Sequence, residues 1–173
     1  SNCQFHMHGT IGMQVAGPNL PYAGDWMIGP GNQFASGASL VICQHILITS
    51  GGGGRIIGNK LNSCGSNNIF APYGTYGVRW APNLAVAQNS LEPIVVSGNT
   101  IEGLSIGLYF DGSFVGQTAT ATQMTICGNQ IWCLQDIVMT PTSVNAQWIS
   151  GVQITGNYLS SQTVISVTTT TNN

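Results

Sequence analysis

The sequence predicts an all-β chain whose short strands stack as a parallel β-helix, a solenoid of about five to six coils. Three observations lead to this fold class. A Gly-Asn turn motif recurs along the chain, an alternating pair of apolar residues follows most copies of it, and the stretches between them lack the helical period of apolar residues. Turns rich in Gly, Asn, Ser and Pro separate the strands, which excludes repeats built from helices.

The turn motif reads apolar-x-Gly-Asn-x-apolar. Full copies lie at residues 56–61, 96–101, 126–131 and 154–159, and a degenerate copy lies at 31–34. Gly and Asn are the residues that best tolerate the left-handed backbone of a sharp bend. If the coils stack, the asparagines of the motif form a ladder in which amide groups bond from coil to coil. The residues of this ladder are Asn32, Asn59, Asn99, Asn129 and Asn157.

The apolar residues on either side of each turn predict the core. We expect one inward column from Phe34, Leu61, Ile101, Ile131 and Leu159, and a second from Ile56, Val96, Ile126 and Ile154. The alternating pairs predict a further strand in each coil, at Met13/Val15, Leu40/Ile42, Val78/Trp80, Leu108/Phe110, Ile137/Met139 and Ile165/Val167. Val78 follows Asn59 at a longer interval than its counterparts, so we expect a loop insertion at about 62–76.

The repeated Ile-x-Gly-Asn-x-Ile motif resembles the asparagine-ladder turn of the pectate-lyase-like superfamily, and it covers nearly the whole chain. That superfamily includes polysaccharide lyases and hydrolases and the trimeric tailspikes of bacteriophages. The resemblance implies a right-handed parallel β-helix. It is specific for the fold and weak for function, because one fold supports many activities.

Composition narrows the class of partner. Charged residues make up 5% of the chain and the net charge is −2, so the polar surface must come from neutral groups. Lys and Arg together number three, which is too few for a protein that follows a phosphate backbone, and we expect no nucleic-acid partner. Apolar runs are too short for a spanning helix, so we expect no membrane insertion. We expect one domain over 1–173, cut from a longer polypeptide because the sequence opens within a repeat.

Candidate catalytic residues follow from strand alternation. If Leu108 and Phe110 point inward, then Gly107, Tyr109 and Asp111 point outward. Neighbouring coils then place Arg79 beside Tyr109 and diagonal to Asp111, with Asp136 on the same face. Arg79, Asp111 and Asp136 are the catalytic candidates, although the two acids are offset too far along the strands for an easy carboxylate pair. The structural alternative is a surface ion pair with the Arg on a Tyr ring.

Candidate sugar-binding residues are the aromatic side chains Tyr109, Tyr73, Tyr76 and Trp132. Their rings can stack on sugar faces, or they can pack the insertion against the solenoid. His6 and His8 share one strand face, but two histidines do not complete a metal site. We therefore expect neither a metal nor a cofactor.

These features favour a phage or prophage tailspike or tail-fibre segment that recognises host cell-surface polysaccharide, with degradation of that polysaccharide left open. The resemblance implies a homotrimer, located on the virion tail or outside the cell. One rival is a secreted bacterial polysaccharide lyase or glycoside hydrolase, and the other is a purely structural β-helix.

Overall fold

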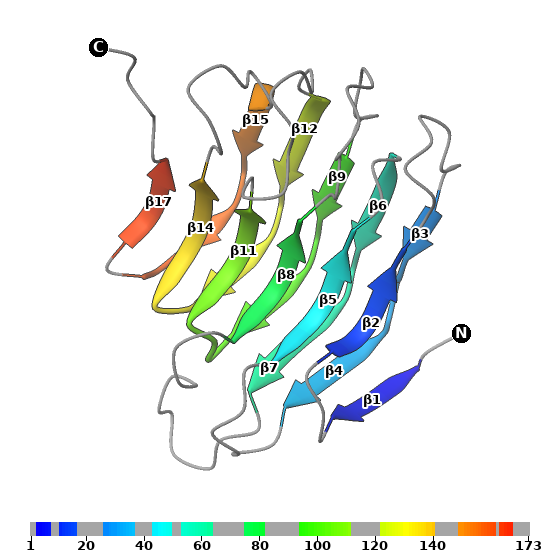
Figure 1. Cartoon of the computed structure of the whole chain (residues 1–173). Coiled ribbons are helices and arrows are strands. Elements are labelled where there is room, and N and C mark those ends of the chain that lie inside the picture. The colour runs from blue at the N-terminus through cyan, green and yellow to red at the C-terminus, as the bar shows by residue number, and fades with distance from the viewer. Residues whose placement is uncertain are drawn as a thin grey trace.

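The computed structural model describes residues 3–7, 11–16, 26–36, 43–49, 53–63, 75–81, 94–111, 122–140, 149–161 and 163–167. All regular structure in these residues is β-strand, and the strands form three sheets (Figure 1). Every pairing between them is parallel. Residues 64–74, which form most of the expected insertion and include Tyr73, lie outside the described residues.

We name the sheets A, B and C. Sheet A contains, in stacking order, β1 (Gln4–Met7), β4 (Gln33–Ser36), β7 (Lys60–Ser63), β10 (Thr100–Glu102), β13 (Gln130–Trp132) and β16 (Tyr158–Leu159). Sheet B contains β2 (Ile11–Val15), β5 (Gln44–Ile48), β8 (Tyr76–Trp80), β11 (Ile106–Asp111), β14 (Gln135–Thr140) and β17 (Thr163–Val167). Sheet C contains β3 (Trp26–Ile28), β6 (Gly54–Ile57), β9 (Ile94–Ser97), β12 (Thr122–Cys127) and β15 (Ile149–Thr155).

The connectivity is that of a β-solenoid. Consecutive strands enter different sheets, and each strand pairs with the third strand after it in the chain. In Figure 1 the colours therefore run in order across the stack, from blue at β1 and β2 to red at β17. This arrangement is consistent with the predicted all-β solenoid.

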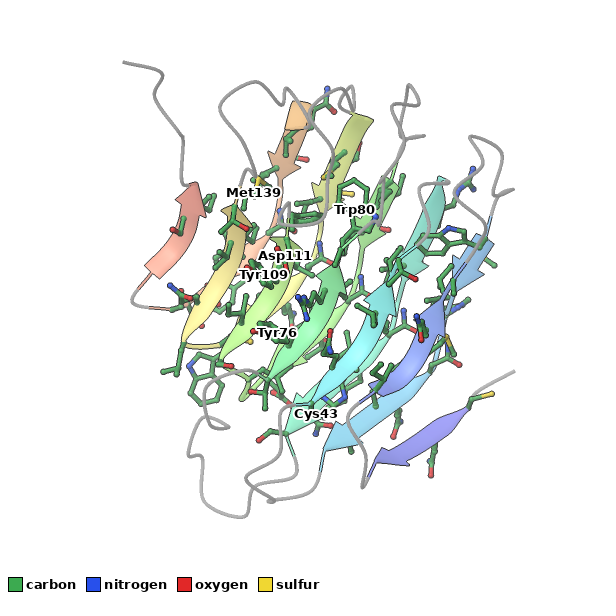
Figure 2. All side chains as sticks on the ribbon, viewed as in Figure 1. Cys43, Tyr76, Trp80, Tyr109, Asp111 and Met139 are labelled. Carbon is green, nitrogen blue, oxygen red and sulfur yellow. The ribbon has the colours of Figure 1, made fainter. Side chains whose placement is uncertain are left out.

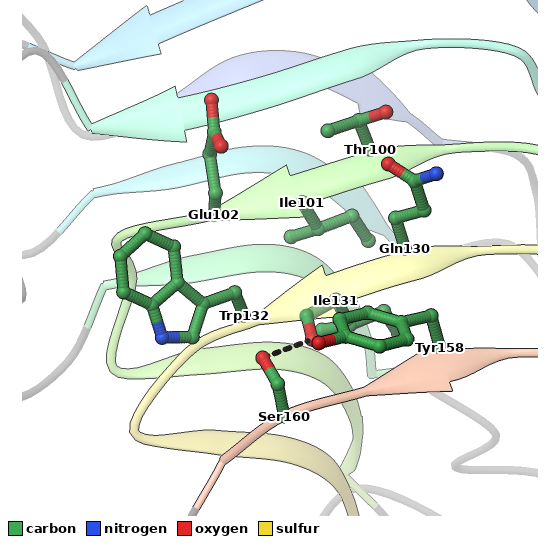
Figure 3. A pocket seen from close by; sticks show the side chains of 8 residues that line it. All are labelled: Thr100, Ile101, Glu102, Gln130, Ile131, Trp132, Tyr158 and Ser160. Atoms are coloured by element: carbon green, nitrogen blue, oxygen red, sulfur yellow. Dashed lines mark hydrogen bonds between the residues drawn. The ribbon is translucent and has the colours of Figure 1, made fainter.

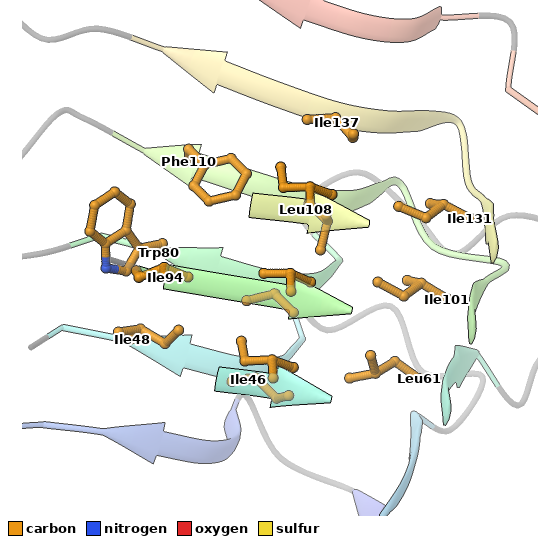
Figure 4. Close-up of a cluster of buried hydrophobic side chains, with 14 of the residues drawn as sticks. Ile46, Ile48, Leu61, Trp80, Ile94, Ile101, Leu108, Phe110, Ile131 and Ile137 are labelled. Carbon is orange, nitrogen blue, oxygen red and sulfur yellow. The ribbon is translucent and has the colours of Figure 1, made fainter. Parts of the chain in front are cut away.

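The core lies between the three sheets and consists of columns of aliphatic side chains (Figure 4). Phe34, Leu61, Ile101 and Ile131 are fully buried and lie in one register column, which Leu159 continues. Sheet C contributes a second column through Ile56, Val96, Ile126 and Ile154. Both core columns predicted from the sequence are confirmed, and each fully buried aliphatic side chain contributes roughly 1.5–3 kcal/mol.

One predicted strand was misplaced. Leu40 and Ile42 were expected in the sheet B column, but Ile46 and Ile48 occupy it, paired with Val78 and Trp80, and Leu40 and Ile42 lie outside the described residues. Two apolar runs follow each other in this segment, and both satisfy the alternating pattern. Pairing with the neighbouring strand selects the second run, six residues further along the chain.

The corner between sheets C and A holds the asparagines of the turn motif. The side-chain amide of each donates to the Oδ1 of the next, at 3.1 Å from Asn32 to Asn59, 3.0 Å to Asn99, 2.9 Å to Asn129 and 2.8 Å to Asn157. The same amide of Asn99 also donates to the Ile56 carbonyl oxygen at 2.9 Å. The glycine before each asparagine has a positive φ, 63° at Gly98, which explains the Gly-Asn pair. The sequence motif therefore corresponds to one repeated, hydrogen-bonded corner.

Candidate functional site

The outward face of sheet B brings Arg79 and Asp111 together. Arg79 lies opposite Tyr109 in register, and its guanidinium reaches diagonally to the Asp111 carboxylate, with Nη2 to Oδ2 at 2.6 Å and Nε to Oδ2 at 3.1 Å. Arg79 Nη1 also lies 3.4 Å from the Gln44 side-chain oxygen. This is a charge-assisted fork that fixes the direction of the guanidinium.

Tyr76 and Tyr109, which are labelled in Figure 2, both lie near this guanidinium. The rings of Tyr76 and Tyr109 stack at 5.3 Å between centroids, and the Arg79 guanidinium carbon lies 5.6 Å and 5.9 Å from the two rings. Burial raises the pKa of the Tyr76 phenol, and the nearby Arg79 charge opposes that rise. We call Arg79, Asp111, Tyr76 and Tyr109 the sheet B cluster.

The sheet B cluster is poorly accessible. Asp111 is 2% exposed and the Arg79 side chain is 23% exposed. Leu47 and Val138 occupy the same outward column as Arg79 and Tyr109, and both are buried. A face that buries its own aliphatic residues offers little area to a polymer ligand.

Asp136 does not belong to this cluster. The expectation that it shares the exposed face is wrong, because its side chain is fully buried. Its two oxygens accept from backbone N–H groups, Oδ1 from Cys133 at 3.1 Å and Oδ2 from Ser161 at 3.0 Å. Asp136 thus closes the corner between β13 and β14.

The error at Asp136 has a local cause. The second and third residues of β8, β11 and β14 are both buried, so simple alternation fails there, and Gly77 and Gly107 are buried rather than outward. A Cβ on Gly107 would lie 2.6 Å from Ile131 Cγ2 and 2.8 Å from the Asp136 carbonyl oxygen. The chain turns inward at this column, and glycine is needed where the turn meets the core.

A groove of about 420 Å³ lies on the outward face of sheet A (Figure 3). Trp132 and Tyr158 lie on its two sides with Ser160 between them. Trp132 is 48% exposed and Tyr158 is 68% exposed. The lining residues are Thr100, Ile101, Glu102, Gln130, Ile131, Trp132, Tyr158 and Ser160. We call this the sheet A groove.

Polar groups at the sheet A groove are mostly neutral. Glu102 lies beside Trp132 in register, and its carboxylate pairs with Lys60 Nζ at 3.3 Å. Gln130 lies between Thr100 and Tyr158 in the neighbouring column and is exposed. The groove thus combines two apolar ring surfaces with amide and hydroxyl groups, which is a composition suited to a polyhydroxylated ligand.

Trp132 is the groove residue that was predicted from the sequence to bind sugar, because of its aromatic ring. Tyr158, Gln130 and Glu102 were missed, although the repeat carries a signal for them. The residue after each ladder asparagine points outward, as does the residue two positions further on. Once the coils are stacked, these two positions of the repeat therefore predict both outward columns of sheet A.

Metal and thiol chemistry find little support in the described part of the chain. It contains no group of three His, Cys, Asp or Glu side chains close enough to hold a metal ion. Burial raises the pKa of the Cys133 thiol to about 12, which disfavours the reactive thiolate. Among the same residues, no helix has the length and apolar character needed to span a bilayer.

Comparison of the sequence with protein-family models and with curated proteins finds no match, and comparison of the fold with solved structures finds none. The candidate sites must therefore be judged on their own geometry.

Proposed function

We propose that this chain is part of a phage or prophage tailspike or tail fibre, a right-handed β-helix of about five to six coils that recognises host cell-surface polysaccharide. One observation carries the proposal: Trp132 and Tyr158 stand largely exposed on either side of the sheet A groove. Large aromatic side chains left in water on a rigid sheet are uncommon unless a ligand or partner covers them.

A sugar chain suits these side chains better than other ligands. The C–H face of a pyranose ring can stack on indole or phenol, while its hydroxyl groups meet Gln130, Thr100 and Ser160 at the groove. Nucleic acid would need a basic surface, and the Lys60 ammonium is already paired with Glu102. The tailspike assignment and a homotrimeric state rest on the resemblance of the asparagine-ladder motif.

Degradation of the polysaccharide is a second candidate activity. The observation in its favour is the sheet B cluster, where the ion pair of Arg79 and Asp111 lies beside two stacked tyrosines. Incubation with a bound polysaccharide and analysis of the products would test it. Shortened chains that disappear with Asp111→Asn, in a variant that still binds, would support an enzyme, and intact chains would support recognition alone.

The proposed function is tested by binding to a panel of purified bacterial capsular and lipopolysaccharide O-chain polysaccharides, immobilised for biolayer interferometry. We expect a subset of the panel to bind, and Trp132→Ala and Tyr158→Ala each to weaken that binding about tenfold or more. Gln153→Ala, an exposed strand residue on sheet C rather than on the sheet that carries the groove, is the control. Absence of binding across the panel would leave a purely structural β-helix as the better explanation.

A further inference from the structure

The outward face of sheet A extends well beyond the groove. Strand register places its outward residues in two columns that run across the strands, along the axis of the stack. One column is Gln4, Gln33, Lys60, Thr100, Gln130 and Tyr158. The other includes Ala35, Asn62, Glu102 and Trp132. We call these two columns together the sheet A track.

The sheet A track changes character along its length. Its aromatic end, at Trp132 and Tyr158, belongs to the strands β13 and β16. Away from that end Gln130, Gln33 and Gln4 are exposed amides, and Thr100 and the exposed Lys60 lie between Gln130 and Gln33. Amide side chains both donate and accept hydrogen bonds, which matches the hydroxyl groups of a sugar. The stacking platform is thus continued by a row of hydrogen-bonding side chains in which the Lys60 charge is paired with Glu102.

The spacing of this row suits a linear polymer that runs along the stack. Neighbouring strands lie about 4.8 Å apart, so each coil offers a new outward residue at that interval. One pyranose unit of an extended polysaccharide advances by a similar length. A chain laid along the axis therefore meets a further residue of each column at every coil, whereas a chain laid across it meets one residue of each column.

The charges on the track cancel. Of the Asp, Glu, Lys and Arg residues in the sequence, Lys60 and Glu102 are the ones at outward positions of sheet A, and they form an ion pair. Arg79 faces outward from sheet B and is bonded to Asp111. A carboxylated sugar on the track would find no unpaired cation there and would be repelled by Glu102.

We propose that the sheet A track binds a linear, uncharged polysaccharide along the axis of the stack, with Trp132 and Tyr158 holding one end of it. This inference rests on the proposed function and names the ligand class and its direction. The amide groups of Gln130 and Gln33 lie three coils apart in register, with Thr100 and Lys60 between them, so they bond sugar units that are separated along the polymer. The binding is insensitive to salt because no net charge is neutralised.

The experiment uses the same immobilised polysaccharide panel, sorted into uncharged polymers and polymers that carry uronic or sialic acid. We expect the tightest binders to be uncharged, with affinities that change less than about twofold when the ionic strength is raised from low to high. Oligosaccharides cut from the best binder then test direction. Gln33→Ala should weaken binding of long fragments several-fold and leave short fragments unaffected, while Trp132→Ala should weaken both.

The possible results distinguish two claims: that the chain binds polysaccharide at all, and that it binds an uncharged one along the axis of the stack. Failure of every polysaccharide to bind would remove the proposed function itself. Preferential binding of acidic polymers would leave recognition standing and overturn the uncharged ligand class. Binding that survives Trp132→Ala and Tyr158→Ala but is lost in Tyr109→Ala would place the ligand on sheet B and overturn the track. An equal effect of Gln33→Ala on short and long fragments would overturn the axial direction.

Discussion

The outward faces of sheets A and B carry the same kinds of side chain in different surroundings. Among the described residues, each carries an ion pair and two Tyr or Trp side chains. On sheet B the ion pair of Arg79 and Asp111 is largely buried and the rings of Tyr76 and Tyr109 stack on each other. On sheet A the pair of Lys60 and Glu102 is solvated, and the rings of Trp132 and Tyr158 stand apart across a groove.

The two faces differ in how much of their aromatic and charged side chains is exposed to solvent. On sheet B the aromatic and charged groups contact one another, so removing one of them leaves its partner largely buried and uncompensated. On sheet A Trp132 is 48% and Tyr158 is 68% exposed, so part of their apolar surface is available to a ligand. The same kinds of side chain therefore form a structural cluster on sheet B and a candidate binding surface on sheet A.

The largest expected effect is on the sheet B ion pair. Asp111→Ala leaves the Arg79 guanidinium half-buried without its carboxylate, and we expect a loss of about 3 kcal/mol of unfolding free energy. Urea denaturation followed by fluorescence measures it. Glu102→Ala, which removes the acid of the solvated pair, is the matched control and should cost under about 1 kcal/mol. Equal losses in the two variants would mean that the two faces do not differ as described.

A second effect concerns a buried histidine within sheet B. His45 on β5 is fully buried beside the Phe34 ring, and burial lowers its pKa from 6.5 to about 4, with the Asn62 backbone partly opposing that shift. Since the unfolded chain binds the proton more readily, stability is complete above about pH 6.5 and falls as the pH drops towards 4. The full loss from this group is about 3 kcal/mol.

Unfolding free energies between pH 7 and pH 5 test this effect, in a window above the range where carboxylates titrate most strongly. We expect His45→Leu to flatten the slope in that window. A variant with the same slope as the parent protein would show that another group is responsible. Sheet A strands have no such buried titratable side chain among the described residues, so groove variants should keep the parent slope.

The smallest effect is expected for the solvated ion pair. Replacing both partners, in Lys60→Gln with Glu102→Gln, removes two opposite charges and leaves neutral amides on the track. We expect a change in unfolding free energy within about 0.5 kcal/mol and binding of an uncharged polysaccharide within about threefold of the parent protein. A large loss of binding would mean that Glu102 contacts the sugar directly through its charge.

The sequence motif predicted more of the fold than of the site. Gly-Asn spacing and the flanking aliphatic residues identified the core columns, because each repeat had to present the same residue type to the same interior. Pattern alone could not choose between Leu40/Ile42 and Ile46/Ile48, since two apolar runs in succession fit equally well. Strict alternation also failed at Asp136, where two neighbouring residues both turn inward at a corner.

Side-chain exposure explains why the site was harder to predict. Register places Arg79 diagonal to Asp111 as alternation suggested, but residue pattern alone could not show that this pair would be largely buried. Tyr158 follows a ladder asparagine and so points outward in every reading of the repeat. Its importance emerges only when the next coil brings Trp132 to the other side of the groove.

The sequence by itself determined the repeat, the all-β class, the inward columns and the scarcity of charge, because these depend on residue type and local spacing. Only the tertiary structure decided which outward residues are covered and which are open to solvent. Accessibility is a property of what lies above a residue in space, and residues in separate coils supply that covering. The aromatic pair on sheet A is therefore a candidate binding surface for a reason that no single repeat contains.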